Sequence, residues 1–187
     1  MYISESNVQT LVKDTNHLNI KGICNNIQSN IIALSDIAFE DDLTSKTFEY
    51  TRRNGSASQI TYSSEGTKFA SVIQAYTPIL TEATSWEMTF EMKPSTSTRV
   101  GVGIGIQDVN ATMFATDVSN TGYFNKNVYT TNWNTIKIVR EGNEYYAIIN
   151  NNTSNKITKD NPPENRLSVW KWGGGNMILR NLKVKLI

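Results

Sequence analysis

Apolar and polar residues alternate along much of the chain from Phe39 onward, and a period of two is typical of a half-buried β-strand. The clearest case is residues 86–93, where every second residue is apolar: Trp86, Met88, Phe90 and Met92. One face of this strand is predicted to line a core, while the other carries the polar residues to solvent or to a groove. Pro94 ends the strand.

Turn residues predict a hairpin early in this region. Asn54-Gly55 lies between the alternating residues 46–53 and 56–63. Asn-Gly supplies the positive φ angles of a type I′ turn, so these two segments are predicted to pair with each other. Residues 67–76 are predicted to form the next strand as a single element.

A second hairpin is predicted over residues 133–150, with its turn at Gly142-Asn143. A two-residue loop there places Ile136 and Ile138 on one face with the apolar residues of the returning strand: Tyr145, Ala147 and Ile149. Two last strands, 166–172 and 177–187, follow after further turn residues. Many short strands and no convincing long helix predict an all-β, antiparallel sandwich.

The strand predicted over residues 99–107 has an unusual bare face. Its apolar residues are Val and Ile, and glycines stand between them at 101, 103 and 105. Glycines inside a strand cost conformational entropy, so the space they leave should serve a purpose. Either bulky side chains of neighbouring strands cover this face, which we favour, or it is the floor of a groove where a ligand approaches the backbone.

Residues 1–38 follow a different pattern and are predicted to be an extension of the main domain, residues 39–187. Five apolar residues fall at the a and d spacing of a heptad: Ile20, Ile23, Ile27, Leu34 and Ile37. They cover about two and a half heptads, fewer than a stable coiled coil needs. The segment is either the end of an oligomeric stalk, for example a homotrimer, or a short helical or irregular extension on the sandwich.

Composition and charge exclude several classes of function. The 187 residues include 18 basic and 17 acidic side chains. The chain therefore lacks the net positive potential that sequence-independent nucleic-acid binding needs. One Cys and one His are too few for an internal disulfide or a typical zinc site, and no cofactor is predicted. The start lacks the features of a signal peptide, and no apolar run is long enough to insert in a membrane. The 22 Asn, 21 Thr and 16 Ser suit short strands joined by turns.

The hairpin residues also carry a resemblance to a known family. In residues 133–143, Trp133 opens a strand of alternating apolar and basic residues that ends at a Gly-centred turn, and residues 145–151 return. This pattern resembles the hairpin of concanavalin A-like lectin/glucanase domains, laminin-G-like modules among them. Residues 181–187 are similar to the final strand of these folds. The resemblance covers residues 39–187 and implies an antiparallel jelly-roll β-sandwich that binds glycans.

Aromatic side chains supply candidate ligand-binding residues. Trp170 and Trp172 project from the strand face opposite Leu167 and Val169, about 7 Å apart. Flat aromatic rings stack on the apolar C–H faces of sugars. Three further residues complete the candidate set. Tyr123 and Tyr129 lie in the polar stretch before Trp133, and Gln107 ends the strand predicted over residues 99–107. Packing in the core or under a loop is the alternative role of all these rings.

Catalysis and metal binding have weaker support. The glucanase signature of the family is Glu-x-Asp-x-Glu, and Glu87-x-Thr89-x-Glu91 lacks its central Asp. The backbones of Glu87 and Glu91 would lie about 13 Å apart on a flat strand, too far for paired carboxylates. Asp108-Val109-Asn110 is too small a fragment of an oxygen-ligand set to predict calcium.

We therefore expect a non-catalytic carbohydrate-binding or receptor-recognition module of a larger fibre or surface protein. A phage tail on the virion surface is the preferred setting, and an extracellular surface is the other. The expected partner is a glycan or a cell-surface receptor. Two alternatives remain: a structural or protein-binding adhesin module of the same fold, and a glycoside hydrolase that uses Glu87 and Glu91.

Overall fold

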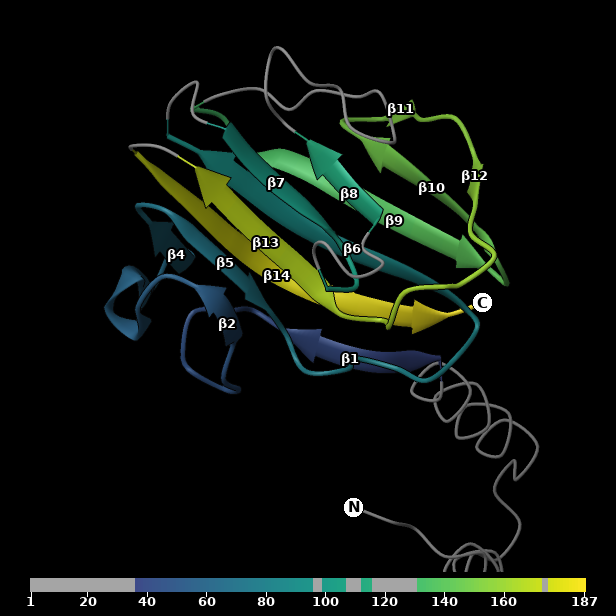
Figure 1. Ribbon diagram of the computed structural model, residues 1–187, viewed down its shortest axis with the longest axis horizontal. Helices are drawn as coiled ribbons and strands as arrows, with labels where there is room; N and C mark the ends of the chain where they lie inside the picture. Colours follow the sequence, from purple (N-terminus) through teal and green to yellow (C-terminus); the bar gives the residue numbers. More distant parts are fainter. Residues whose placement is uncertain (1–35, 96–98, 107–111, 116–130, 173–174) are drawn as a thin grey trace, which may run out of the picture. The chain divides into compact units, whose positions relative to one another are not determined.

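The computed structural model describes residues 36–95, 99–106, 112–115, 131–172 and 175–187 (Figure 1). The chain divides into two units, Met1–Asp36 and Ile37–Ile187. The predicted stalk or helical extension therefore lies outside the described residues, and its oligomeric role stays a prediction. Ile37, counted above with the heptad positions, is a strand residue that pairs with Lys185.

The second unit contains two antiparallel sheets packed face to face (Figure 1). Within the described ranges, sheet A has nine strands: β1 (Ile37–Asp41), β3 (Ile60–Ser63), β4 (Gly66–Ala70), β6 (Ser85–Pro94), β9 (Asn134–Glu141), β10 (Glu144–Ile149), β11 (Asn152–Thr153), β12 (Ile157–Thr158) and β14 (Asn176–Leu186). The described part of sheet B has five: β2 (Thr51–Asn54), β5 (Ile73–Tyr76), β7 (Arg99–Ile104), β8 (Thr112–Ala115) and β13 (Leu167–Trp172). The predicted antiparallel β-sandwich is confirmed.

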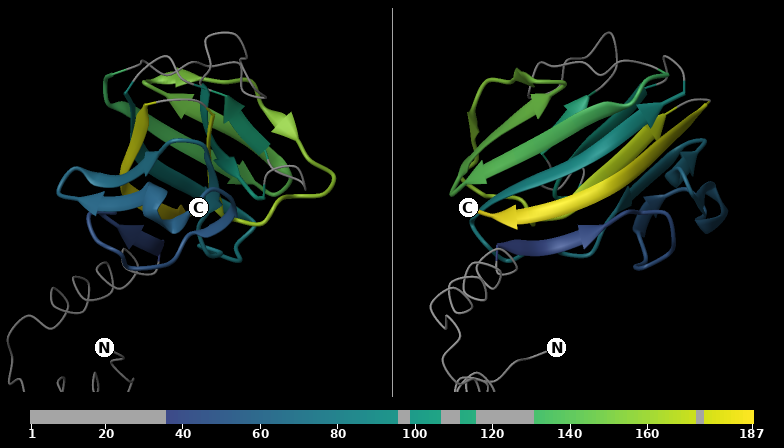
Figure 2. Two further views of the ribbon diagram at one scale, coloured as in Figure 1. Left: turned by 60° about the vertical axis from the view of Figure 1, so that its left-hand side comes forward. Right: turned by 180° about the vertical axis from the view of Figure 1, so that it is seen from behind.

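The long strand β14 organises sheet A. It pairs with β6 along one edge, while β4 and β1 share its other edge. The order across the sheet is β11-β10-β9-β6-β14-β4-β3, with β12 beside β10. Seen from behind, β9, β6, β14 and β1 run side by side in green, teal, yellow and purple (Figure 2). The order in sheet B is β2-β5-β13-β7-β8.

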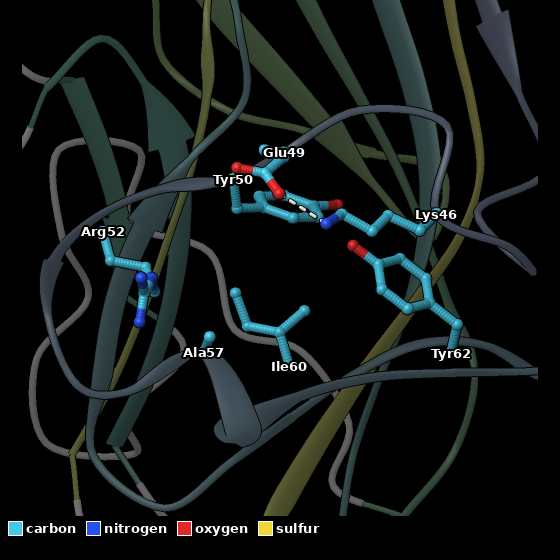
Figure 3. A pocket seen from close by; sticks show the side chains of 7 residues that line it. All are labelled: Lys46, Glu49, Tyr50, Arg52, Ala57, Ile60 and Tyr62. Atoms are coloured by element: carbon cyan, nitrogen blue, oxygen red, sulfur yellow. Dashed lines mark hydrogen bonds and ion pairs between the residues drawn. The ribbon is translucent and has the colours of Figure 1, made fainter.

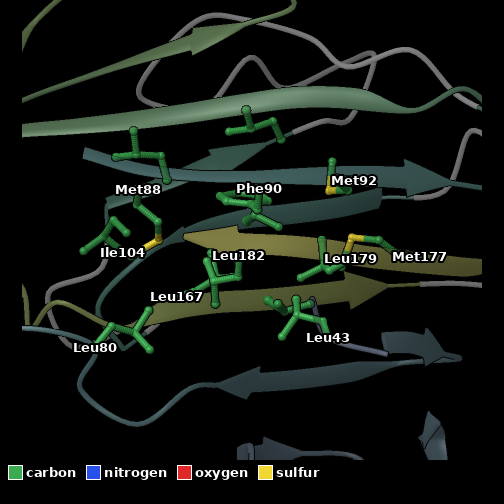
Figure 4. Close-up of a cluster of buried hydrophobic side chains, with 14 of the residues drawn as sticks. Leu43, Leu80, Met88, Phe90, Met92, Ile104, Leu167, Met177, Leu179 and Leu182 are labelled. Atoms are coloured by element: carbon green, nitrogen blue, oxygen red, sulfur yellow. The ribbon is translucent and has the colours of Figure 1, made fainter. Parts of the chain in front are cut away.

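The core lies between the sheets and follows the predicted alternation. The four apolar residues of β6 are at most 1% exposed, and the polar residues between them face outward. Met88 and Phe90 of sheet A join Ile104 and Leu167 of sheet B in one cluster (Figure 4). The period of two along β6 therefore correctly identified its buried face.

The hairpin at Gly142-Asn143 is confirmed. Strand β9 pairs with β10 through Glu141 and Glu144, which leaves a two-residue turn. Gly142 has a φ of 61°, the positive value that a tight hairpin turn needs at its first position. All five residues predicted to share the inner face are buried: Ile136, Ile138, Tyr145, Ala147 and Ile149.

The hairpin predicted at Asn54-Gly55 is wrong. Strand β2 lies in sheet B beside β5, whereas β3 lies in sheet A beside β4. The chain crosses between the sheets here through Gly55, with a φ of 88°, and a short 3-10 helix, Ala57–Gln59. Asn54 is not among the residues with positive φ, so a type I′ turn is absent at this described position.

A second crossing divides the segment predicted as one strand over residues 67–76. Its first half is β4 in sheet A, and its second half is β5 in sheet B. Ser71, between them, has a φ of 58° and breaks the extended backbone. Residues 55–72 thus leave sheet B after β2, form a hairpin in sheet A, and return as β5 directly beside β2.

Candidate functional site

The predicted tryptophan face lies on the side of sheet B away from the core. Leu167 and Val169 are buried in the core, so Trp170 projects from the opposite face as expected. However, Trp170 is only 7% exposed. A Cβ atom added to Gly101, its partner on β7, would lie 2.1 Å from Cε2 of the indole. The ring thus fills the space above Gly101, as the packing interpretation of the bare face requires.

The rest of the predicted binding set cannot be placed beside Trp170. Gln107, Tyr123 and Tyr129 lie outside the described residues, as do Asp108-Val109-Asn110. Trp172 ends β13, and its side chain is also outside the described part of the structure. A glycan platform at Trp170 and Trp172 therefore stays a prediction.

Glu87 and Glu91 lie on the outer face of β6, and each has a cationic partner. Lys137 donates to Glu87 at 2.8 Å, and Arg180 donates to Glu91 at 2.7 Å. The hydrogen bond from Arg180 is the largest cause that lowers the pKa of Glu91, so this carboxyl group is ionised at neutral pH. A lowered pKa is the opposite of what a general acid needs, so Glu91 lacks the environment of one.

A pocket of about 150 Å³ opens where the chain passes from sheet B to sheet A (Figure 3). It has walls from both sheets because the segment before β2 and the crossing at Gly55 face each other here. Its described lining consists of Lys46, Glu49, Tyr50, Arg52, Ala57, Ile60 and Tyr62. A cavity of about 150 Å³ can hold a ligand the size of one benzene ring.

The apolar part of the pocket is held by core packing. Tyr50 is 6% exposed, and its ring packs edge-on against Phe69 with centroids 5.1 Å apart. Ile60 of β3 is partly buried and packs against the same core. The hydroxyl groups of Tyr50 and Tyr62 point toward Lys46 (Figure 3). The rings therefore present apolar surface with polar atoms at one end.

The polar rim carries both signs of charge. Lys46 donates a hydrogen bond to Glu49, which raises the pKa of Lys46 and lowers the pKa of Glu49. Burial is the main cause that raises the pKa of Tyr62, so its hydroxyl stays protonated at neutral pH. Arg52 is exposed on the opposite wall. Donors and acceptors thus surround an apolar floor.

This pocket was not predicted from the sequence. Residues 46–53 and 56–63 were expected on opposite arms of one hairpin, where their side chains would pair across a sheet. The pocket exists because these segments lie in different sheets. Tyr50 and Tyr62 were visible as aromatic residues near Gly55, yet no local pattern indicates a crossing.

In the part of the chain that the structure describes, no three His, Cys, Asp or Glu side chains come close enough to hold a metal ion. No helix within those ranges has the length and apolar character needed to cross a membrane.

Comparison with solved structures reveals proteins of the same fold. The Crh5 transglycosylase in complex with NAG has a TM-score of 0.58 and 12% identity, over 79% of this chain and 83% of that chain. The carbohydrate-binding module CBM66 from Bacillus subtilis has a TM-score of 0.56 and 10% identity, over 73% and 94%. A Bacillus subtilis protein of unknown function with a galectin-like fold has a TM-score of 0.57 and 7% identity, over 80% and 96%.

The domain has a galectin-like, concanavalin A-like fold. At such low identities the likeness establishes the fold alone, and it agrees with the resemblance in the hairpin residues. No family model matches the sequence, and no curated protein matches it.

Proposed function

We propose that the domain is a non-catalytic carbohydrate-binding module that holds a sugar ring in the pocket between the two sheets. The observation that carries this proposal is the lining of the pocket, in which an apolar floor is surrounded by charged and hydroxyl groups. A sugar ring has the same division, with C–H groups on its faces and hydroxyl groups at its edge. The likeness to a carbohydrate-binding module supports the proposal.

Each part of the pocket has a role in this proposal. The ring of Tyr62 offers a half-buried aromatic surface for the C–H face of the sugar. The ionised Glu49 accepts hydrogen bonds from sugar hydroxyls, and Lys46 and Arg52 donate to their oxygen atoms. Tyr50 is fixed by the core, so it holds one wall of the pocket without the entropy cost of ordering a loop.

The carboxylates of β6 support a role without catalysis. Glu87 and Glu91 are four residues apart on a continuous strand, so their backbones are separated by about 13 Å. The paired carboxyl groups of retaining glycosidases are about 5 Å apart, and those of inverting enzymes less than about 10 Å. Each Glu also forms an ion pair on the outer face of the sheet, Glu87 with Lys137 and Glu91 with Arg180.

We also propose that the module belongs to a larger surface or fibre protein, with a phage tail as the preferred setting. The support is the organisation of the sequence, in which the extension at residues 1–38 carries heptad-like positions. Light scattering on the full chain tests this setting, because a stalk predicts an oligomer. A monomer at all concentrations would contradict it.

A glycan array with the full chain, followed by calorimetry on the glycans that bind, tests the pocket. Tyr62→Ala should weaken binding about tenfold, because it removes the stacking surface. Glu49→Gln should weaken it as well, because the charged acceptor is lost. Tyr146→Ala is the matched control, since Tyr146 is a half-buried tyrosine on the outer face of sheet A.

Several outcomes would overturn the proposal. Absence of binding to any glycan would reject the sugar-binding function. Unchanged binding by Tyr62→Ala and Glu49→Gln, together with loss in Trp172→Ala, would move the site to the predicted tryptophan face. Release of reducing ends from a bound glycan, abolished by Glu87→Gln, would show that the domain is an enzyme.

A further inference from the structure

A second candidate site lies on the outer face of sheet A, away from the pocket. A row of directly opposed residues crosses four adjacent strands there. Thr61 of β3 faces Lys68 of β4, Lys68 faces Ile178 of β14, and Ile178 faces Lys93 of β6. These residues line a groove of about 500 Å³, larger than the pocket between the sheets.

The floor of the groove is apolar and its sides are basic. Ile178 is half-buried between the two lysines, whereas its neighbours Met177 and Leu179 point into the core. Lys68 and Lys93 are two strands apart, so their backbones are separated by about 10 Å. Among the described residues, no carboxylate lies within 4.0 Å of either ammonium group.

The neighbouring charges leave this positive character in place. The ammonium group of Lys93 lies 5.6 Å from the ring centroid of Trp133, which does not neutralise it. Arg180 stacks on the same ring at 3.8 Å and forms an ion pair with Glu91. Glu65 is the one acidic residue in the described lining, and it lies exposed in the turn between β3 and β4.

We propose that this groove binds an anionic oligosaccharide, with carboxylate groups at Lys68 and Lys93 and a sugar ring over Ile178. The two ammonium groups supply charge-assisted hydrogen bonds, and Ile178 contacts the C–H face of the ring. Thr61, at the end of the row, adds a hydroxyl group for the sugar edge. The site is separate from the pocket lined by Tyr62 and stands on different residues.

An oligosaccharide fits this groove better than a nucleic acid does. A phosphate backbone is bound by an extended basic surface, and the whole chain has a net charge of only +1. The described lining has no aromatic ring on which a base could stack, and the nearby ring of Trp133 already packs against Arg180. Two cations around an aliphatic floor match a ligand of moderate charge with many hydroxyl groups.

Calorimetry with oligogalacturonate and with its methyl ester tests the proposal on the full chain. The two probes share the sugar rings and differ at the carboxyl groups, which are charged in the acid and neutral methyl esters in the other probe. We expect the acid to bind and the ester to bind at least tenfold more weakly. Lys68→Gln and Lys93→Gln should each weaken binding of the acid by about two- to fivefold at low salt, and these effects should shrink in higher salt because salt screens the charges. A sulfated oligosaccharide measures whether carboxylate is preferred over sulfate.

The controls separate this site from the pocket and from nonspecific charge. Lys185→Gln is the matched control, because Lys185 is an exposed lysine of β14 outside the groove. It should bind the acid as wild type does, and so should Tyr62→Ala. Equal binding of acid and ester, or equal effects of Lys93→Gln and Lys185→Gln, would overturn the proposal. Stronger binding of a single-stranded oligonucleotide than of oligogalacturonate would also overturn it.

Discussion

The close approach of Trp170 to Gly101 makes a quantitative prediction about the bare face of β7. In Gly101→Ala, the new methyl carbon would lie 2.1, 2.3 and 2.4 Å from Cε2, Cζ2 and Nε1 of the indole. Such distances are far below van der Waals contact, so the ring or the strand must move. The ring is buried and the strand is paired on both sides, so neither moves freely.

The magnitude follows from two opposing effects. Forcing extra volume into a packed site costs about 1–3 kcal/mol. Replacing a strand glycine with alanine gains about 0.5–1 kcal/mol, because the unfolded chain has less entropy to lose. We expect Gly101→Ala to lower the free energy of unfolding by about 1–2 kcal/mol in the wild type. In a Trp170→Ala background only the gain remains, so the same substitution should be neutral or stabilising.

Guanidinium unfolding followed by far-UV circular dichroism measures all four proteins of this cycle. The expected coupling energy is about 1–3 kcal/mol, the size found for residues in direct contact. Gly142→Ala provides a control for additivity, because its Cβ would meet no atom within 4 Å. Gly142→Ala should lower the free energy of unfolding by the same amount in both backgrounds, because its effect comes from the positive φ of 61° at this residue. If Gly101→Ala destabilises both backgrounds equally, the ring is not the reason for the glycine.

Two further predictions concern buried polar groups. Asn165→Ala should lower the free energy of unfolding by about 2–4 kcal/mol, because Asn165 accepts from Arg140 at 2.6 Å and donates to the backbone oxygens of Thr81 and Ala83. Burial raises the pKa of Tyr50, so the folded protein keeps a proton that the unfolded chain releases near pH 10. Stability should therefore fall as the pH rises above about 10, and Tyr50→Phe should reduce this fall.

Chemical denaturation measures both effects. Asn161→Ala, at an exposed asparagine in the same connection, should change stability by less than about 0.5 kcal/mol. An equally small effect of Asn165→Ala would contradict the proposed role of its hydrogen bonds. For Tyr50, unfolding curves are compared between pH 8 and pH 11. If wild type and Tyr50→Phe lose the same free energy of unfolding over this pH range, another group causes the decline.

Elements whose partner strand follows directly in the sequence could be predicted well. The hairpin at Gly142 pairs two neighbouring segments, so its turn residues and its alternation carry all the necessary information. The buried face of β6 could be predicted equally well, because the strand has one face toward the core and its apolar residues alternate regularly with polar ones. In both cases the period of two determines which residues are buried.

Crossings between sheets could not be predicted from local residues. Gly55 permits a positive φ, which serves a hairpin and a crossing equally well. Whether the chain forms a hairpin or a crossing depends on later strands. Here β2 pairs with β5 in sheet B, and β3 pairs with β4 in sheet A. The split at Ser71 has the same origin, because a single non-glycine residue with positive φ gives no warning in the sequence.

The same limit applies to the sites. Trp170 was correctly assigned to the outer face of its strand, but the sequence does not show that its ring lies over Gly101. The pocket could not be predicted because its lining residues Arg52 and Tyr62 lie on strands of different sheets, β2 and β3. The groove on sheet A depends on strand register. Lys68 and Lys93 lie on either side of Ile178 only because β14 pairs with β4 and with β6 in the observed register.

The position of the pocket has a thermodynamic consequence. Its walls belong to two layers, with Arg52 in sheet B and Ile60 in sheet A, so the pocket is complete only while the layers are docked. A ligand held there binds the native sandwich and not a separated sheet. Occupancy should therefore raise the melting temperature of the whole domain by mass action, in proportion to the logarithm of ligand concentration. A ligand bound on the outer face of one sheet would not bridge the layers in this way.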